Sequence, residues 1–152
     1  NNTNKNISLR IIGGGKGYAF RKMVKSAHKN DPLGEFIELV DFLPHEQIIK
    51  ELINSDLFIF ASSCENLPIT LLEAMASSIP IISSSRGPMR EILGEKFIYF
   101  DPANIRSIYN ALDEIMNKKK CIDYLCSTAK NRSKKYTWSR CSKKTWELLS
   151  GI

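Results

Sequence analysis

Leu57-Phe-Ile-Phe-Ala61 is followed by Ser62-Ser-Cys-Glu65-Asn-Leu-Pro-Ile69 and then by Thr70-Leu-Leu-Glu73-Ala-Met-Ala-Ser-Ser78. The first segment is continuously apolar, which is typical of a strand in a parallel sheet that helices cover on both faces. The last segment predicts a helix, so the order is strand, loop, helix. Glu65 would lie in the loop and Glu73 in the first turn of the helix. Ligands of open α/β sheets bind at the carboxyl ends of the strands, so we expect the two carboxylates to flank a functional cleft.

Similar patterns lie on both sides of this unit. Short apolar or β-branched runs predict strands at residues 7–12, 36–41, 80–83 and 97–100. Apolar residues at helical spacing predict helices at residues 18–30, 44–55 and 105–115. This alternation indicates an α/β fold built on a doubly wound parallel sheet. After residue 117 the pattern changes to helices alone, at residues 121–135 and 137–149.

Length and composition fit one folded domain. The 152 residues are 43% hydrophobic, so we expect a single domain over residues 1–152, with residues 117–152 as its helical tail. No apolar run approaches the roughly 20 residues that a membrane-spanning helix needs. The chain begins with neither a Met nor an apolar leader, so we expect it to be a fragment of a longer protein.

The positive charge is concentrated in the tail. Residues 117–152 contain ten Lys or Arg and two Asp or Glu, a net charge of +8, whereas the rest of the chain is net −2. Cations such as Lys134 and Lys143 could form a solvated helix face or favour an anionic membrane. A nucleic-acid-binding module could use the same charge, but aromatic residues are not interleaved with the cations and no docking motif is present. We therefore expect no nucleic-acid partner.

The cysteines do not suggest a metal site. Cys64, Cys121, Cys126 and Cys141 are scattered without the close pairs of structural zinc motifs, and only two histidines accompany them. We expect reduced and mostly packed thiols, no metal site and a cytoplasmic location.

The loop and helix at residues 62–73 have the residue types of an anion site. The first N–H groups of a helix lack intrahelical partners and lie at the positive end of its dipole, so they attract phosphate. An ionised Glu73 could accept hydrogen bonds from the hydroxyls of a sugar diol. Two simpler explanations stay open. Thr70 and Glu73 have the spacing of a capping box, and Glu65 could be a solvated loop residue.

The order of these features resembles a known family. Residues 57–83 resemble the E-x7-E segment of the retaining nucleotide-sugar glycosyltransferases of family 4. Pro80, the turn at residues 85–93 and Phe100-Asp-Pro102 resemble the landmarks that follow in that family, in the same order. The resemblance runs from about Ile7 to Leu149. It implies the C-terminal, donor-binding, Rossmann-like half of a GT-B enzyme, which normally closes on an N-terminal acceptor-binding half.

The resemblance also implies roles for single residues. Glu73 would hold the ribose of the donor, and Glu65 would face the transferred sugar as the catalytic residue. The variant phosphate loop and the helix-start amides would receive the diphosphate, at Asn66, Leu67, Pro68, Ile69, Thr70 and Leu71.

Other positions match the family less closely. Gly13, Gly14 and Gly15 match a glycine-rich turn near the donor phosphates or the acceptor, although a plain strand-to-helix turn explains them as well. Phe42 and Leu43 match the loop that contacts the nucleotide base, without the usual glycine. Lys16 and Arg86 could pair with the diphosphate or be ordinary surface cations. The upstream Arg and Lys that grip the diphosphate in the family are absent from this chain.

The function that the resemblance implies is hexosyl transfer, with retained anomeric configuration, from a nucleotide diphosphate sugar to a saccharide or lipid-linked acceptor. No metal or cofactor is required, because backbone dipoles can stabilise the leaving diphosphate. We expect the chain alone to bind the nucleotide weakly without turnover. Its partners would be the nucleotide sugar, the N-terminal acceptor domain and, through the basic tail, the inner face of a bacterial membrane in polysaccharide biosynthesis. The alternative is a non-catalytic nucleotide-binding or interaction domain of the same fold.

Overall fold

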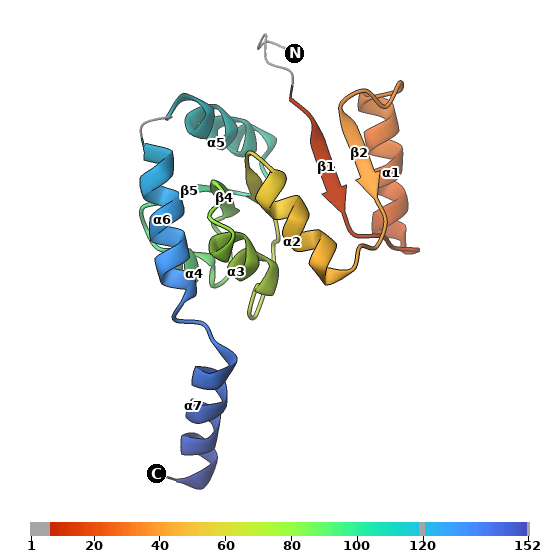
Figure 1. The fold of residues 1–152 in the computed structure, drawn as a ribbon. Coiled ribbons are helices and arrows are strands. Elements are labelled where there is room, and N and C mark those ends of the chain that lie inside the picture. Colours follow the sequence, from red (N-terminus) through yellow and green to blue (C-terminus); the bar gives the residue numbers. More distant parts are fainter. Residues whose placement is uncertain (1–6, 119–120, 152) are drawn as a thin grey trace. The chain divides into compact units, whose positions relative to one another are not determined.

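The computed structural model describes residues 7–118 and 121–151, which divide into two compact units, residues 1–48 and 49–152 (Figure 1). The strands are β1 (Leu9–Ile12), β2 (Ile37–Val40), β3 (Phe58–Phe60), β4 (Ile81–Ser84) and β5 (Ile98–Phe100). The helices are α1 (Tyr18–Asn30), α2 (His45–Asn54), α3 (Ile69–Ala76), α4 (Met89–Leu93), α5 (Ile105–Asn117), α6 (Ile122–Ser133) and α7 (Trp138–Ser150). Every strand pair is parallel, which confirms the predicted alternating α/β organisation of the described residues.

The first unit is a strand–helix–strand arrangement. β1 and β2 pair in register from Leu9 opposite Ile37 to Ile12 opposite Val40, and α1 connects them. The bounds of α1 are those that the sequence predicts. Its half-buried residues, Phe20, Met23 and Ala27, are spaced by three and four positions, as one face of a helix requires.

A buried carboxylate shapes the connection from α1 to β2. Asp31 follows α1 and is only 5% exposed. Its two oxygens accept backbone N–H hydrogen bonds from Glu35 at 3.0 Å, Phe36 at 2.8 Å and Ile37 at 2.6 Å. Burial alone would raise the pKa of Asp31, but these hydrogen bonds favour the ionised form and hold its pKa below the ordinary value. Asp31 therefore fixes the loop that leads into β2, a role that the sequence analysis missed.

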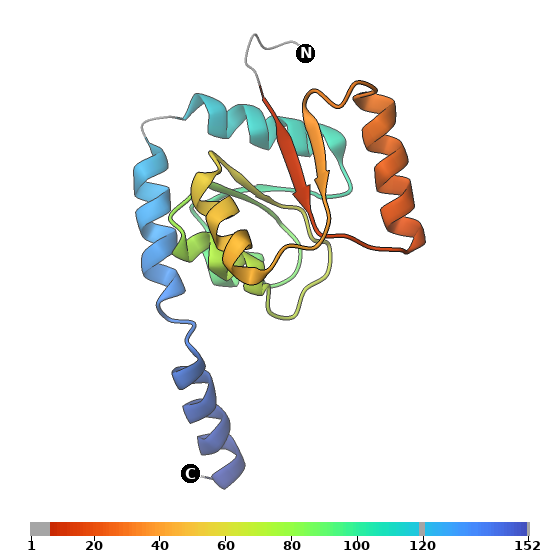
Figure 2. The same ribbon diagram turned by 45° about the vertical axis from the view of Figure 1, so that its right-hand side comes forward.

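The second unit contains a three-stranded sheet in the order β3–β4–β5. All four residues of the central strand β4 are buried, as expected for a strand covered on both faces. α5 packs against β4 and β5, and α3 packs against α6, which lies beside it in both ribbon views (Figures 1 and 2). The largest fully buried side chains of this core include Leu71, Met75, Ile82 and Phe100.

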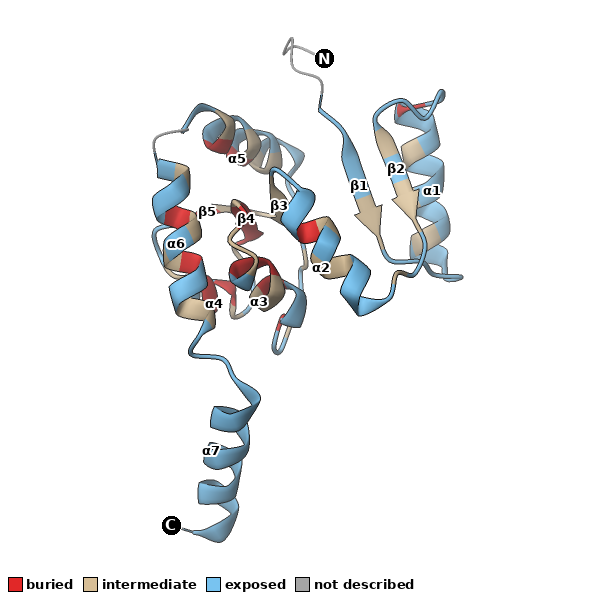
Figure 3. Ribbon diagram, viewed as in Figure 1, coloured by how far each residue is buried: buried red, intermediate tan, exposed pale blue. Residues whose placement is uncertain are grey.

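α7 contributes nothing to this core. All of its residues are exposed, including Trp138 and Trp146 (Figure 3). The helix is nevertheless well defined locally, because the Oγ1 atom of Thr137 accepts a hydrogen bond from the backbone N–H of Arg140 at 3.2 Å and Gly151 ends the helix with a φ of 69°. The apolar stripe of this helix, which contains Trp138, Cys141, Thr145 and Leu149, therefore has no cover among the described residues.

Two expectations about local structure are wrong. The turn expected at residues 85–93 contains α4, whose Met89, Ile92 and Leu93 are buried at helical spacing after Pro88. The thiols are unpaired but are not mostly packed. Cys64, Cys121 and Cys141 are exposed and only Cys126 is half-buried, because the first three lie in a loop, at a helix start and on the uncovered α7. No helix in the described residues is both long enough and apolar enough to cross a membrane.

Candidate functional site

The start of α3 has the unsatisfied amide groups of an anion site. The helix begins at Ile69, and its N-cap residue Pro68 provides no side-chain hydrogen bond. Among the described residues, no hydrogen bond uses the backbone N–H groups of Ile69, Thr70 or Leu71, whereas Leu72 already donates to the Pro68 carbonyl at 3.2 Å. Three donors at the positive end of a helix are therefore available to a negatively charged group.

The side chains around these amides divide into exposed and buried ones. Asn66, Leu67, Ile69 and Thr70 are exposed, whereas the Leu71 side chain is fully buried in the core. Leu71 can therefore meet a ligand only through its backbone. Its side chain anchors the start of α3 and so fixes the direction of the three N–H groups.

The capping-box interpretation of Thr70 and Glu73 is wrong. A capping box needs Thr70 at the N-cap position, but Pro68 occupies that position and Thr70 is the second helical residue. The same shift places Glu73 in the second turn of α3, not in the first turn as expected. Glu73 is half-buried there, and its backbone carbonyl accepts from the N–H of Ser77 at 2.9 Å. Thr70 and Glu73 therefore do not occupy the positions of a capping box.

Glu65 and the turn after β4 are brought together. Glu65 is half-buried in the loop between β3 and α3. Gly87 has a φ of +63°, and a Cβ atom at that position would lie 3.6 Å from the Glu65 carbonyl oxygen. The turn that contains Arg86 and Gly87 thus packs on the backbone of the Glu65 loop, so both belong to one edge of the β3–β4–β5 sheet.

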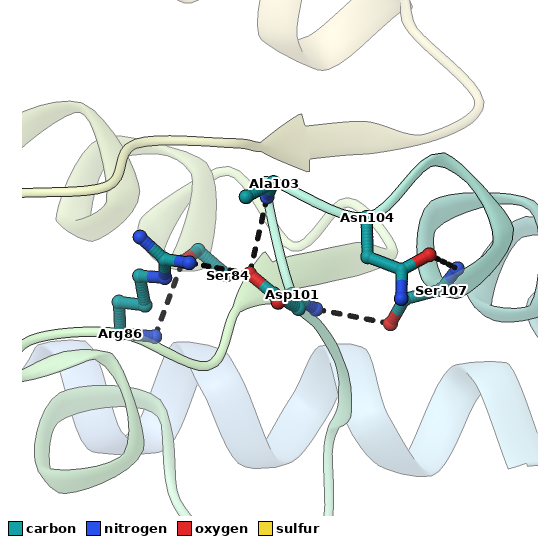
Figure 4. Close-up of polar contacts among 6 residues, drawn as sticks. All are labelled: Ser84, Arg86, Asp101, Ala103, Asn104 and Ser107. Atoms are coloured by element: carbon teal, nitrogen blue, oxygen red, sulfur yellow. Dashed lines mark hydrogen bonds and ion pairs between the residues drawn. The ribbon is translucent and has the colours of Figure 1, made fainter.

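Arg86 takes part in a polar network at this edge (Figure 4). Its Nη2 atom lies 2.9 Å from the Oδ1 atom of Asp101, and both side chains are nearly half exposed. The backbone N–H of Ala103 also donates to Asp101 Oδ1, at 3.1 Å. The Ala103 hydrogen bond is the main reason that the pKa of Asp101 is lowered. Burial opposes the shift, and the Arg86 charge and hydrogen bond add to it.

The remaining predicted residues lie in the first unit. Gly13 has a φ of +127°, and a Cβ atom on Gly14 would lie 1.5 Å from the Oδ1 atom of Asp41. The glycine turn and the residue before Phe42 are therefore in close approach, which only a glycine at position 14 allows. Lys16 is exposed, Phe42 is 81% exposed and Leu43 is half-buried. The structure thus explains Gly13 and Gly14 locally and leaves the aromatic ring of Phe42 open to solvent.

A surface groove lies elsewhere. It has a volume of about 520 Å³, and its lining comes wholly from α7, with Trp138 and Trp146 as the largest side chains. It contains neither Glu65 nor Glu73. Among the described residues, no group of three His, Cys, Asp or Glu side chains is placed to hold a metal ion.

The part of Asp101 in this network was not predicted from the sequence. Phe100-Asp-Pro102 was predicted only as a landmark of the family. The available signal was its position, because a charged residue directly after a buried strand lies at the carboxyl edge of the sheet, where Arg86 also lies.

Known proteins resemble the chain in sequence and fold. A family model described as "Glycosyl transferases group 1" matches residues 1–135. The chain is 25% identical to the phosphatidylinositol N-acetylglucosaminyltransferase GPI3 subunit of Saccharomyces cerevisiae over 154 residues, which cover 99% of this chain and 33% of that protein. The chain thus spans about a third of this curated relative.

Two solved structures show the same fold. Sucrose-phosphate synthase from Thermosynechococcus elongatus matches with a TM-score of 0.81 and 19% identity, over 95% of this chain and 38% of that one. Anabaena HepE in complex with UDP matches with a TM-score of 0.81 and 16% identity, over 96% of this chain and 41% of that one. The fold is therefore the Rossmann-like α/β fold found in GT-B glycosyltransferases. The match of the family model over most of the chain shows that the chain belongs to the glycosyl transferases group 1 family.

Proposed function

We propose that the chain is the donor-binding half of a retaining glycosyltransferase, which transfers a hexosyl group from a nucleotide diphosphate sugar to a saccharide or lipid-linked acceptor. The observation that carries the proposal is the start of α3, where three backbone N–H groups lack a hydrogen-bond partner among the described residues. When the sugar leaves, negative charge grows on the diphosphate. Amide groups fixed in advance stabilise that charge without reorganising during the reaction.

The two carboxylates have different roles in this proposal. Glu73 accepts hydrogen bonds from the ribose hydroxyls of the donor from the second turn of α3, because an ionised carboxylate offers two acceptor oxygens to a diol. Glu65 faces the transferred sugar from the loop before α3. Asn66, Leu67 and Pro68 form the phosphate loop between Glu65 and the helix-start amides.

The first unit would contribute the nucleotide base contact and a backbone surface. The exposed ring of Phe42, with Leu43 beside it, can pack on the base. The glycine turn at residues 13–15 and Lys16 would lie near the phosphates or the acceptor. Support for a uridine nucleotide comes from HepE, which was solved in complex with UDP.

The relatives support a proposal for the acceptor and for the acceptor-binding half. GPI3 is named for transfer to phosphatidylinositol, which supports a lipid acceptor. Because the chain spans about a third of that protein, the acceptor-binding half would be supplied by the rest of the parent polypeptide. The exposed apolar stripe of α7 suits packing on that half. Contact of the basic tail with the cytoplasmic face of a membrane is the alternative, which liposome flotation with and without anionic lipid tests.

Isothermal titration of the chain with UDP, GDP and ADP tests the proposal. We expect weak binding of one nucleotide diphosphate, no metal requirement and no sugar transfer by the chain alone. Absence of binding to all three nucleotides would refute the donor-site assignment. Sugar transfer by the parent polypeptide separates the enzyme from a non-catalytic nucleotide-binding domain.

Variants of the two carboxylates test their assigned roles. Glu73→Ala should weaken nucleotide binding by about tenfold, the value of a lost hydrogen bond to a charged group. Glu65→Ala should leave nucleotide binding nearly unchanged and reduce sugar transfer by the parent polypeptide. Glu95→Ala provides the control, because Glu95 is an exposed carboxylate of the same unit that pairs with Arg90. If Glu73→Ala binds the nucleotide as tightly as this control, the ribose assignment is wrong.

A further inference from the structure

We propose that Asp101 is a positioning residue, which holds the guanidinium of Arg86 at the carboxyl edge of the β3–β4–β5 sheet so that it contacts the leaving diphosphate. This inference rests on the proposed donor site and adds a second source of positive charge to the amides of α3. It starts from the network in Figure 4, where the ion pair joins segments 15 residues apart in the sequence.

The sheet register brings the two residues together. β4 and β5 are parallel, with Ser84 opposite Phe100, so the residues that follow both strands emerge at one edge. The backbone N–H of Ser85 still donates to the Phe100 carbonyl at 2.8 Å. Arg86 and Asp101 are the next charged residues on each side, and their pairing follows from this register.

Asp101 is the fixed partner of the pair. Its backbone N–H donates to the Ser107 hydroxyl at 3.0 Å, and its carbonyl accepts from the N–H of Asn104 at 3.0 Å. Asn104 in turn caps α5, because its Oδ1 atom accepts from the Ser107 N–H at 3.1 Å. With Ala103 also donating to Oδ1, the carboxylate is anchored at the start of a helix.

Arg86 is held at two points and open elsewhere. Its backbone N–H donates to the Oγ atom of the buried Ser84 at 3.1 Å, and only its Nη2 atom binds Asp101. Among the described residues, its Nε and Nη1 atoms have no hydrogen-bond partner. A guanidinium has five N–H donors in a planar fork, so a phosphate can bind the remaining ones while Asp101 keeps the plane in place.

Gly87, the residue after Arg86, connects this guanidinium to the proposed donor site. The backbone of Gly87 lies close to the Glu65 loop, since a Cβ atom added at Gly87 would be 3.6 Å from the Glu65 carbonyl oxygen. Arg86 is therefore attached to the turn that contacts the Glu65 loop. Asp101 is ionised at neutral pH, since the ordinary pKa of an aspartate is 3.8 and the Ala103 hydrogen bond lowers it further.

Asp101→Ala distinguishes a positioning role of Asp101 from a purely electrostatic effect, because the two predict opposite changes in UDP affinity. A carboxylate near a diphosphate repels it, so electrostatics alone predicts that Asp101→Ala binds UDP more tightly. Positioning predicts the opposite, because the guanidinium loses its orientation. We expect Arg86→Gln to weaken UDP binding by about tenfold and Asp101→Ala by about fivefold, as hydrogen bonds to a charged group are lost or misplaced.

The experiment is a double-mutant cycle in the full parent polypeptide. UDP is titrated calorimetrically into wild type, Arg86→Gln, Asp101→Ala and the double variant, with GDP and ADP in parallel, and uridine binding is followed by ligand-observed NMR. The double variant should bind UDP no more weakly than Arg86→Gln alone, since Asp101 acts through Arg86. Uridine binding should not change, because uridine has no phosphate. Asp101→Asn, which keeps an acceptor for Ala103, should lie between wild type and Asp101→Ala.

The controls make each outcome decisive. Glu95→Gln breaks the Arg90–Glu95 pair, which has the same 2.9 Å length in the same unit, and should leave UDP binding unchanged. The inference is wrong if Asp101→Ala and Asp101→Asn bind UDP as tightly as wild type or more tightly. It is also wrong if the variants lose UDP binding and uridine binding equally. If wild type binds none of the three nucleotides, the proposed function itself fails. Unfolding curves of every variant identify losses caused by misfolding.

Discussion

Truncation of Leu71 should cost much more stability than truncation of Ile69, although both are apolar residues in the first turn of α3. The Leu71 side chain is 0% exposed and the Ile69 side chain is 52% exposed. Leu71→Ala removes three buried carbon groups, worth about 2.4 kcal/mol at about 0.8 kcal/mol each, and leaves a cavity that adds to the cost. We therefore expect Leu71→Ala to lower the free energy of unfolding by about 3 kcal/mol.

Ile69→Ala is the matched variant, because it removes the same number of side-chain carbon atoms as Leu71→Ala. Ile69→Ala removes apolar groups that are only about half covered, so the lost burial should cost about 1 kcal/mol of stability. The higher helix propensity of alanine offsets a few tenths of a kcal/mol of this cost. Urea unfolding of the 152-residue chain, followed by circular dichroism, measures both values. A loss in Leu71→Ala that is no greater than the loss in Ile69→Ala would refute the assignment of Leu71 to the core and, with it, the fixed direction of the helix-start amides.

Two further predictions concern the first unit. Because the pKa of Asp31 is held below its ordinary value of 3.8, its stabilisation is complete above that pH and is lost as the pH falls through the lower folded value. Asp31→Asn should therefore be less stable than wild type at pH 7, with the difference shrinking below about pH 4 in acid unfolding curves. Gly14→Ala should lower the melting temperature because its Cβ would lie 1.5 Å from the Asp41 Oδ1 atom, and Asp41→Ala should restore most of the loss. Gly17→Ala, which has open space, is the control, and a failure of the rescue would contradict the steric explanation.

Long periodic segments were predictable from the sequence, and short ones were not. α1 and α5 have apolar residues on one face over 13 residues each, a pattern that identifies a helix without tertiary information. α4 has five residues, too few for a period to stand out, and its helical form depends on the burial of Met89, Ile92 and Leu93. The capping box failed for a related reason. The Thr70–Glu73 spacing is local, but the N-cap is the buried Pro68, which lies two residues before Thr70.

The candidate site shows where sequence reasoning ends. Glu65, Glu73 and the α3 amides lie within nine residues, so one strand–loop–helix unit predicts them together. Asp101 is different, because its partner Arg86 lies on another connection, and nothing in either local sequence states that β4 and β5 are parallel neighbours. That register decides which charged residues meet, and a shift by one residue would place other side chains opposite each other. The electrostatics of a site at the edge of a parallel sheet therefore depends on strand order, which is why the arginine was predictable as a candidate and its carboxylate partner was not.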